Sequence, residues 1–470
     1  MWKIIYFYME FKQFIDRKSE VARLKKALDR EDAQFIAIYG RRRIGKSTLI
    51  KQVMRLADND IYFLSDTTAE VNQRMLFAKT VALKIEDFDK VVYPDWETLL
   101  RALNRQIPER AVVCLDEFPY LVDSCHSLPS VIQKLLNEKV LRFDLIICGS
   151  SQRSMYGLLL DKKSPIYGMA DEVIKLEPIT AGHAIEALGV DAPRAVEEYS
   201  VWGGIPRYWE LRRDYPNLKS AIKNLILDTQ GMLNDEPQRL LKDDMRDTVQ
   251  AITLLSIIGN GANRISEIGL RAGKDAGTIT EPLAKLRDLG FVEREVPFGE
   301  SPEKSKKGLY HIKDSLLGFL YRFVIPYQSV LELGRYDMVM DMIEEQFSQY
   351  IGLCWEKLCR DYVSGNTVGG ITYKAASRWW GKIFPGGSKE GEMRELDVVA
   401  ESFDKKHLLI GECKWTKEED AERLGKKLQE SIPYLPFIKR GQKVHLVLFL
   451  KEPPLHQNET CIFLPKDILS

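Results

Sequence analysis

Short apolar runs alternate with amphipathic segments along the first part of the chain. The runs have the length and residue types of buried strands, and the segments between them have the apolar spacing of helices. The predicted strands span 35–39, 61–64, 111–115 and 144–148, and helices are predicted at 19–29 and 48–57. Strands that alternate with helices are typical of a parallel sheet covered on both faces. The pattern therefore predicts an α/β domain.

The middle of the chain follows a different pattern. The segment after Pro178 is largely helical, and a Gly-Gly pair followed by a proline interrupts it at 203–206. From 247 onward, three helical segments precede two short strands at 291–296 and 309–312, which flank a polar tip. Three helices followed by a hairpin are the pattern of a winged helix-turn-helix.

The last part of the chain predicts a second α/β domain. A helix from 341 is followed by strands, a glycine-rich loop at 385–391 and a closing strand at 443–450. The fold class is therefore an α/β multidomain protein. The expected boundaries are 1–13 for an N-terminal extension, 14–182 for the parallel-sheet core, 183–246 for a helical lid, 247–330 for the winged helix and 331–470 for the C-terminal domain.

Composition supports several globular cores and an intracellular setting. The chain has 470 residues, of which 45% are hydrophobic, and 68 basic residues balance 68 acidic ones. Because the net charge is zero, a polyanion would have to bind a local basic patch. Seven cysteines show no CxxC pair or regular framework, which favours a reducing cytoplasm.

The first residues, MWKIIYFYMEF, are apolar but too short to span a bilayer, and no small-residue cleavage site follows them. We expect a short extension, with Met9 as an alternative start. We find no other long apolar run and therefore expect no membrane association.

The stretch GRRRIGKS carries the clearest chemistry. It follows the strand at 35–39 and opens the helix at 48–57, as the pattern GxxxxGK[ST] requires. Its backbone N–H groups and the helix N-terminus would surround nucleotide phosphates, with Lys46 on the β- and γ-phosphates and the Ser47 hydroxyl on Mg²⁺. An ordinary strand-to-helix turn is the alternative. The expected phosphate-binding residues are Gly40, Arg41, Arg42, Arg43, Ile44, Gly45, Lys46, Ser47 and Thr48.

Two carboxylates end the strand at 111–115, where a parallel strand would meet the same phosphates. Asp116 suits a direct or water-mediated contact with Mg²⁺, and Glu117 suits orienting or deprotonating an attacking water. Each residue could instead be part of a simple pair of charges at a strand end.

A second group of acids lies in 395–415, which reads as two apolar strands joined by a polar turn. If a two-residue turn is centred on 404–405, Asp397 faces Glu412 and Glu395 faces Lys414. Facing carboxylates repel each other unless a divalent cation such as Mg²⁺ or Mn²⁺ bridges them or one stays protonated. Lys414 could then steer a water or stabilise charge on a phosphodiester. The alternative is a solvent-facing hairpin with a Glu395–Lys414 pair.

Residues 14–240 resemble the archaeal-type ATPase family, which is related to the STAND and AAA+ branches of P-loop NTPases. The resemblance is carried by FIDRKSEVARL, GRRRIGKSTLI, VVCLDEFPYL, ICGSS and WGGIPRY. It implies ATP and Mg²⁺ as ligands. It further implies that Asp16 and Arg17 lie near the adenine, that Ser150 or Ser151 is the sensor at a strand end, and that 204–206, with Pro206, belongs to the lid. By the same resemblance, Arg153 and Arg207 are candidates to touch the γ-phosphate, and plain surface arginines are the alternative.

The C-terminal part resembles a domain of unknown function often fused to these ATPases, which in turn looks like the PD-(D/E)XK nuclease superfamily. The matching residues are Asp397, Glu412 and Lys414, with Glu356 as an additional acid on the preceding helix. Leucine replaces proline before the aspartate. The resemblance implies a restriction-endonuclease-like α/β fold with a Mg²⁺ or Mn²⁺ site, and an inactivated relative remains the alternative.

DNA is the expected macromolecular partner. The segment 249–330 carries eleven Lys and Arg against nine Asp and Glu, which is a weak electrostatic signal. Its basic residues could contact backbone phosphates or form a solvated face; they are Arg271, Lys274, Lys285, Arg287, Lys304, Lys306 and Lys307.

The leading hypothesis is an ATPase whose nucleotide state controls a DNA-binding winged helix and a nuclease-like domain. An ATP-dependent signalling switch with an inactive scaffold is the alternative, and a winged helix that docks protein is a third possibility. Homo-oligomerisation is left open.

Overall fold

The computed structural model describes residues 15–55, 58–108, 110–245, 247–387, 390–454, 456 and 461–469. The predicted N-terminal extension, with Met9, lies outside the described residues. The chain divides into two compact units. The first comprises Met1–Pro178 with Ile205–Arg207 and Lys242–Arg246, and the second comprises Ile179–Gly204, Tyr208–Leu241 and Asp247–Ser470.

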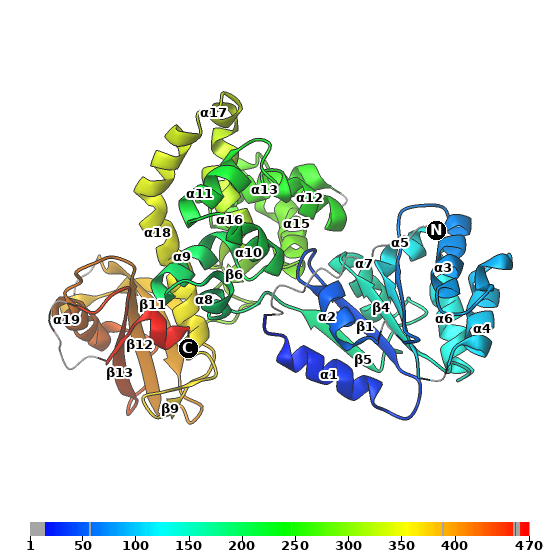
Figure 1. The fold of residues 1–470 in the computed structure, drawn as a ribbon. Helices are drawn as coiled ribbons and strands as arrows, with labels where there is room; N and C mark the ends of the chain where they lie inside the picture. Colours follow the sequence, from blue (N-terminus) through cyan, green and yellow to red (C-terminus); the bar gives the residue numbers. More distant parts are fainter. Residues whose placement is uncertain are drawn as a thin grey trace. The chain divides into compact units, whose positions relative to one another are not determined.

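A parallel five-stranded sheet forms the first unit, as the apolar runs predict (Figure 1). Its order is β2-β3-β4-β1-β5. The strands are β1 (Phe35–Gly40), β2 (Ile61–Leu64), β3 (Val112–Asp116), β4 (Asp144–Gly149) and β5 (Glu172–Leu176). The first four match the prediction to within a residue at each end. The edge strand β5 was not predicted, because its apolar residues alternate with Glu172 and Lys175 over only five positions.

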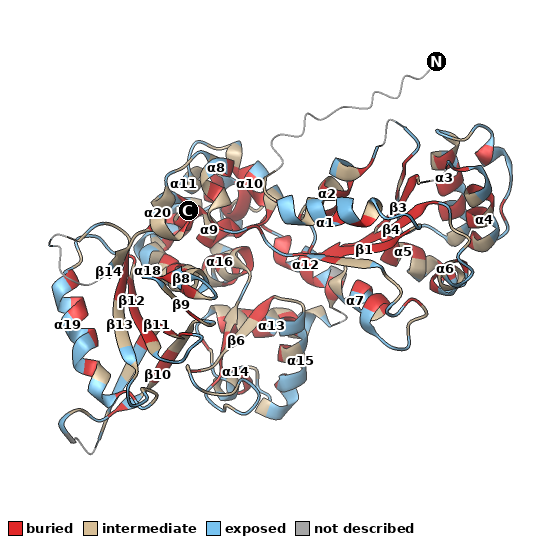
Figure 2. Cartoon of the chain, turned by 90° about the horizontal axis from the view of Figure 1, so that it is seen from below, coloured by how far each residue is buried: buried red, intermediate tan, exposed pale blue. Residues whose placement is uncertain are grey.

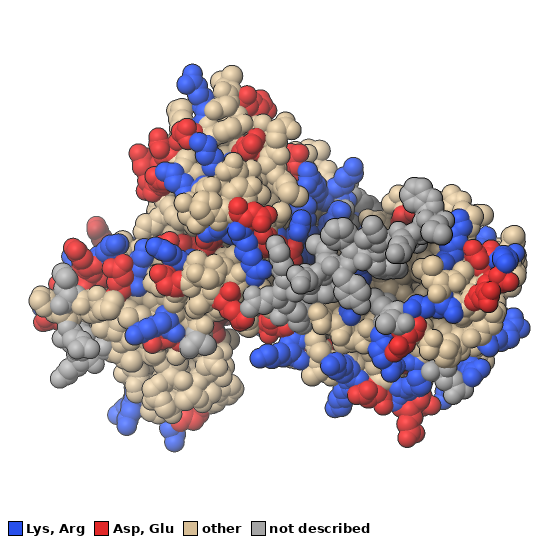
Figure 3. All heavy atoms as spheres, viewed as in Figure 1, with Lys and Arg blue, Asp and Glu red and all other residues tan. Residues whose placement is uncertain are grey.

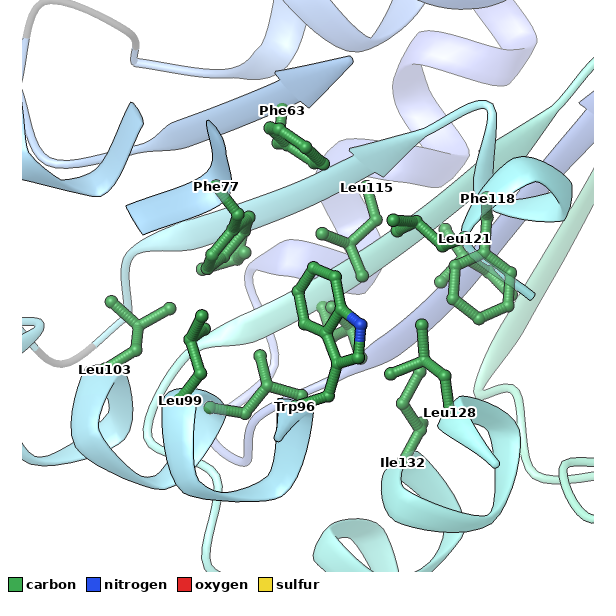
Figure 4. Close-up of a cluster of buried hydrophobic side chains, with 14 of the residues drawn as sticks. Phe63, Phe77, Trp96, Leu99, Leu103, Leu115, Phe118, Leu121, Leu128 and Ile132 are labelled. Carbon is green, nitrogen blue, oxygen red and sulfur yellow. The ribbon is translucent and has the colours of Figure 1, made fainter. Parts of the chain in front are cut away.

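Helices of the first unit follow the strands in alternation. They are α1 (Lys18–Leu28), α2 (Lys46–Val53), α3 (Glu70–Ala82), η1 (Phe88–Lys90), α4 (Trp96–Gln106), α5 (Phe118–Ser124), α6 (Leu128–Asn137) and α7 (Gln152–Leu160). Figure 4 shows the core that α3, α4, α5 and α6 form against the sheet. Within it, Phe77 makes edge contacts with Phe63 and Trp96 at ring-centroid distances of 5.2 and 5.6 Å. Burial of such rings holds the sheet rigid beneath the loops at its edge.

A helical segment comes next, as predicted for the lid. It contains α8 (His183–Leu188), α9 (Ala192–Trp202), α10 (Pro206–Arg213), α11 (Leu218–Ile222), η2 (Lys223–Leu227) and α12 (Glu236–Asp244). A buried bidentate pair between Arg212 and Glu198 links α10 to α9. A Cβ at Gly204 would lie 1.9 Å from the carbonyl oxygen of Ile179, so only glycine fits at this position.

The three predicted helices and the hairpin are present in the predicted order. They are α13 (Thr248–Gly259), α14 (Ile265–Arg271), α15 (Ala276–Asp288), β6 (Val292–Glu295) and β7 (Leu309–Ile312), and β6 pairs antiparallel with β7. Leu283, Leu286 and Leu289 recur at helical spacing, with Leu289 directly after α15; the first two are buried and Leu289 is half-buried. The burial pattern is visible in Figure 2. We call residues 247–314 the hairpin module.

The C-terminal part begins with a connecting group of helices and one long helix. These are α16 (Ser315–Phe323), η3 (Ile325–Tyr327), α17 (Gln328–Glu332) and α18 (Tyr336–Val363). The prediction placed the start of α18 at 341, five residues late. The first turn was not predicted because it begins with the polar residues Tyr336 and Asp337. Only Val339 and Met340 are buried there.

A mixed five-stranded sheet of order β10-β11-β12-β13-β14 follows. Its strands are β10 (Ser377–Ile383), β11 (Glu392–Glu401), β12 (His407–Lys414), β13 (Lys443–Leu450) and β14 (Cys461–Phe463), and the remaining elements are β8 (Thr367–Val368), β9 (Ile371–Thr372), η4 (Pro385–Gly387), α19 (Ala421–Ser431), η5 (Ile432–Tyr434) and α20 (Pro465–Ile468). In the β11–β12 hairpin, Val398 pairs with Gly411 and Val399 with Ile410. This is the predicted register, although residues 402–406 replace the two-residue turn. Among the described residues, no helix is both long and apolar enough to cross a membrane.

Candidate functional site

The GRRRIGKS loop connects β1 to α2 at the edge of the first sheet. Gly45 has a φ of 95°, in the left-handed region that favours glycine. Lys46 is 5% exposed, and its Nζ donates to the carbonyl oxygens of Gly40 at 2.9 Å and Arg41 at 3.1 Å. The loop therefore curves around its own lysine. This geometry presents a cation and the N-terminus of α2 to the same point, as phosphate binding requires.

Asp116 lies beside Ser47, as the order of the strands predicts. The Ser47 hydroxyl donates to Asp116 Oδ2 at 2.6 Å, and Asp116 is 1% exposed. A hydroxyl and a carboxylate are the oxygen ligands that Mg²⁺ prefers, so these two residues fit a magnesium ion.

Tyr62 on β2 makes a contact that the sequence reading missed. Its hydroxyl donates to the same Oδ2 atom of Asp116, and the Nζ of Lys51 lies 4.6 Å from the centre of its ring. Burial raises the pKa of Tyr62, and the neighbouring Asp116 raises it further. The phenol therefore stays protonated and acts as a donor. The alternating pattern of β2 places Tyr62 on the face opposite its neighbours Ile61 and Phe63, which is the only sequence signal for it.

Glu117 is held at the end of β3 by two neighbouring serines. Its φ of 54° lies in the left-handed region, and Ser65 Oγ donates to its carbonyl oxygen at 2.7 Å. Its carboxylate accepts from the backbone N–H of Ser150 at 3.0 Å and from the Ser150 hydroxyl at 2.9 Å. Of the two serines that the resemblance offered as the sensor, Ser150 therefore contacts Glu117. Ser151 Oγ instead accepts from the N–H of Ser154 at the start of α7.

The remaining residues predicted to bind nucleotide differ in their burial and in their contacts with the loop. Arg17 is 6% exposed and donates to the carbonyl oxygen of Ile44 at 3.2 Å, which joins the start of α1 to the loop. A Cβ built at Gly45 would lie 3.9 Å from Pro206 Cγ, so Pro206 is adjacent to the loop. Arg41 and Ile44 are buried, Arg43 and Thr48 are half-buried, Asp16 is half-buried with a φ of 56°, and Arg42, Arg153 and Arg207 are exposed.

The acid hairpin places its predicted residues together. Asp397 Oδ2 accepts from the backbone N–H of Cys413 at 2.8 Å, and Lys414 Nζ lies 2.8 Å from Glu412 Oε1. Burial raises the pKa of Asp397, and the charge of Glu412 raises it further. Burial and the charge of Asp397 likewise raise the pKa of Glu356 to about 7. The four predicted residues are therefore electrostatically coupled.

Side-chain cations surround these acids. Lys414 contacts Glu412, whereas Glu395 lies 3.4 Å from Arg378, so the Glu395–Lys414 pair of the alternative reading is replaced by two other pairs. Arg360 and Arg378 each approach Glu356 at 3.7 Å. Lysine and arginine thus relieve the repulsion for which the sequence reading invoked a metal. Across the described ranges, no group of three or more His, Cys, Asp or Glu has an arrangement that could hold a metal ion.

Neither arginine was predicted from the sequence. Arg360 lies four residues after Glu356 on α18, a spacing that predicts an ion pair. Arg378 comes from β10, and no local pattern connects it to α18.

Replacing Tyr62 by phenylalanine should weaken Mg²⁺ binding to the ADP complex about tenfold. The reason is that one hydrogen bond to a charged group contributes about 1.5 kcal/mol, here to the orientation of Asp116. Calorimetric titration of Mg²⁺ into the ADP-bound protein measures the effect. Tyr93→Phe is the matched control, because the Tyr93 hydroxyl donates to the carbonyl oxygen of Phe88 at 3.1 Å in the same unit. Equal Mg²⁺ affinity in wild type and Tyr62→Phe would show that Asp116 does not need this contact.

The raised pKa of Glu356 predicts a pH-dependent stability. The folded state binds this proton more tightly than the unfolded state, whose carboxyl has a pKa near 4.5. The contribution is therefore complete below about pH 4.5 and is lost as the pH rises through about 7, for a total on the order of 3 kcal/mol. Urea unfolding of metal-free protein between pH 5 and 8 should show the wild type losing stability relative to Glu356→Gln. Parallel profiles for the two proteins would contradict the shift.

Residues 14–209 match a family described as an ATPase domain predominantly from Archaea. Residues 320–424 match a family of archaeal and bacterial proteins of unknown function, and this segment contains the four residues of the acid hairpin site.

Solved structures with similar folds include the ORC2 protein of Aeropyrum pernix, at 16% identity and a TM-score of 0.39 over 68% of this chain and 94% of that one. Cdc6p from Pyrobaculum aerophilum shows 13% identity and a TM-score of 0.33 over 69% and 96% of the two chains. A STAND protein with a tetratricopeptide repeat sensor from Pyrococcus horikoshii shows 14% identity and a TM-score of 0.32 over 74% of this chain and 50% of that one.

An uncharacterized protein of Methanocaldococcus jannaschii is 31% identical over 431 residues, which cover 88% of this chain and 91% of the relative. The similarity thus extends through both units. The chain belongs to the same family as this protein, and its N-terminal part is an ATPase domain of the type found predominantly in Archaea.

Proposed function

We propose that this protein binds ATP with Mg²⁺ and hydrolyses it. The observation that carries the proposal is the loop between β1 and α2, in which Lys46 lies inside the curve and Ser47 lies 2.6 Å from Asp116. Lys46 would neutralise the β- and γ-phosphates. Ser47 and Asp116 would hold Mg²⁺, which supplies charge neutralisation of the phosphates when bound.

Glu117 is the residue suited to activate water. It follows Asp116 at the end of β3. Its carboxylate accepts hydrogen bonds from Ser150, and a water could take the place of Ser150 as the donor. Ser150 follows β4, which lies between β3 and β1 in the sheet, so the serine can sense both the glutamate and the loop. Asp16 and Arg17 would lie near the adenine, where Arg17 already contacts the loop through Ile44.

Replacing Glu117 by glutamine should leave ATP binding intact and lower the hydrolysis rate at least about a hundredfold, because the amide cannot accept the proton of water. Binding of a labelled nucleotide and steady-state phosphate release measure the two effects. Glu138→Gln is the matched control, since Glu138 makes a half-exposed ion pair with Arg101 in the same unit. Lys46→Ala should lose nucleotide binding itself. Undiminished hydrolysis by Glu117→Gln would overturn the assignment of the base.

We further propose that the nucleotide state controls the C-terminal part, in which the hairpin module acts as a winged helix on DNA and the acid hairpin acts as a PD-(D/E)XK-like nuclease site. The support is the position of Asp397 beside the Glu412–Lys414 pair in the β11–β12 hairpin. Such acids, with Mg²⁺ or Mn²⁺, are suited to phosphodiester hydrolysis.

The charges of the hairpin module affect how strongly it would bind DNA. Several of its basic side chains have an acidic neighbour; the pairs are Arg271–Glu267, Lys285–Glu281, Arg287–Asp288 and Lys307–Glu300. On the face drawn in Figure 3, basic and acidic residues are likewise interspersed. The phosphates of DNA would have to compete with these acids for the basic side chains. We therefore expect DNA binding to weaken strongly as the salt concentration rises.

Asp397→Asn should abolish Mg²⁺- or Mn²⁺-dependent DNA cleavage and leave ATP hydrolysis unchanged. Single-stranded, duplex and branched DNA are the substrates to assay, and Asp404→Asn, in the exposed turn of the same hairpin, is the control. Cleavage that persists in Asp397→Asn would refute the site. ATP-dependent DNA binding by a wild-type protein that never cuts would favour the regulatory switch with an inactive scaffold. A failure to bind nucleic acid even at low salt would favour a protein-docking hairpin module.

A further inference from the structure

The chain enters α1 through two residues with unusual backbone conformations. Asp16 and Arg17 have φ values of 56° and 72°, in the left-handed region that residues other than glycine rarely adopt. Two consecutive residues of this kind carry a conformational cost that the surrounding contacts must offset. The side chain of Arg17 is buried and makes such contacts.

The guanidinium of Arg17 joins two groups. Its Nη1 lies 3.0 Å from Glu20 Oε1, one turn along α1, and its Nη2 donates to the carbonyl oxygen of Ile44 at 3.2 Å. Burial alone would raise the pKa of Glu20, but hydrogen bonds from Ser19, from its own backbone N–H and from Arg17 lower it. Glu20 is therefore charged, and it fixes one side of the guanidinium while the other side binds Ile44.

The carbonyl of Ile44 belongs to the GRRRIGKS loop, and its orientation determines that of the next N–H group. The described residues contain no cis peptide bond, and in a trans peptide the C=O and the following N–H point in opposite directions. Because the Ile44 carbonyl points at Arg17, the N–H of Gly45 points away from Arg17. The N–H groups of a loop with this pattern are its phosphate donors. Arg17 thus determines where one of these donors points.

Two kinds of contact hold the carbonyls of this loop. Lys46 binds those of Gly40 at 2.9 Å and Arg41 at 3.1 Å from inside the curve, whereas Arg17 binds that of Ile44 from α1. The peptide that Arg17 holds is followed by glycine, which permits rotation about its φ angle. Loss of the arginine would therefore let this peptide turn. A charged donor on the carbonyl also polarises the peptide and strengthens its N–H as a donor.

We propose that Arg17 is a positioning residue for phosphate binding: by holding the Ile44 carbonyl, it keeps the N–H of Gly45 directed at the phosphates of the nucleotide. The inference rests on the proposed ATP-binding function of the loop. It gives Arg17 a role that does not require contact with the adenine, near which the family resemblance places it.

The test uses the full chain and two ligands that share their phosphates, ATP and inorganic tripolyphosphate, each with Mg²⁺. Isothermal titration calorimetry measures both dissociation constants. Arg17→Gln should weaken both ligands by the same factor, roughly tenfold, because a charge-assisted hydrogen bond no longer orients the donor. A residue that touches only the adenine would affect ATP alone. Unchanged tripolyphosphate affinity in Arg17→Gln would therefore overturn the proposal.

Arg23→Gln is the matched control. Arg23 lies on the same helix and likewise contacts one carboxylate, that of Glu172, and one backbone carbonyl, that of Val173 at 3.4 Å, but both belong to β5. This variant should bind both ligands as the wild type does. Arg17→Lys keeps a charged donor without the fork geometry of the guanidinium and should recover part of the lost affinity. Equal losses in Arg17→Gln and Arg23→Gln would reduce the effect to the stability of α1 and overturn the proposal.

Hydrogen exchange of the nucleotide-free protein separates this inference from the proposed function. The backbone N–H of Ile44 lies 3.4 Å from the carbonyl oxygen of Arg41, and loosening of the loop should speed exchange over 40–47 in Arg17→Gln but not in Arg23→Gln. A wild type that binds neither ligand would refute ATP binding, and faster exchange would still support the hold of Arg17 on the loop. Unchanged exchange in Arg17→Gln would refute that hold itself.

Discussion

A buried carboxylate must be balanced by hydrogen bonds or cations, and both candidate sites of this chain are arranged around that constraint. In the first unit, Asp116 is 1% exposed and receives the hydroxyls of Ser47 and Tyr62. In the second, Asp397 receives a backbone N–H, and Lys414 balances Glu412. Tyr62 and the N–H of Cys413 come from the strands next to those of Asp116 and Asp397, so the strand order of each sheet decides that these groups meet. The fold itself therefore brings each of these acids and its partners together.

The sequence predicts those parts of the fold that local patterns determine. Four strands of the first sheet are continuous apolar runs, and their order along the chain places Asp116 near Ser47. The register of the acid hairpin is also predictable, because centring the polar turn on 404–405 determines which residues of its two strands face each other. The edge strand β5 shows where such patterns fail, since a half-exposed strand of five residues lacks both a continuous run and a clear period.

Contacts between distant segments account for what the sequence could not predict. Tyr62 and Arg378 lie 54 and 19 residues from Asp116 and Asp397, and no spacing rule joins them. For the same reason, the hairpin sequence by itself predicts a metal between its carboxylates. The hairpin contains the repelling carboxylates, but Arg360 of α18 and Arg378 of β10, which lie close to Asp397, come from elsewhere in the chain. A local pattern can thus identify a charge without identifying its partner.

Charge balance has a different consequence in each unit. Around Asp116 the partners are neutral hydroxyls, and Lys46 nearby donates to carbonyl oxygens of its own loop rather than to this carboxylate. Around Glu356 the partners are guanidinium groups that compete directly with a cation for the same oxygens. The first arrangement is prepared for Mg²⁺ whenever a nucleotide arrives. The second is already balanced by arginines of its own chain. Charge balance at the acid hairpin therefore depends on α18 and β10, whereas that of Asp116 depends on the hydroxyls of Ser47 and Tyr62.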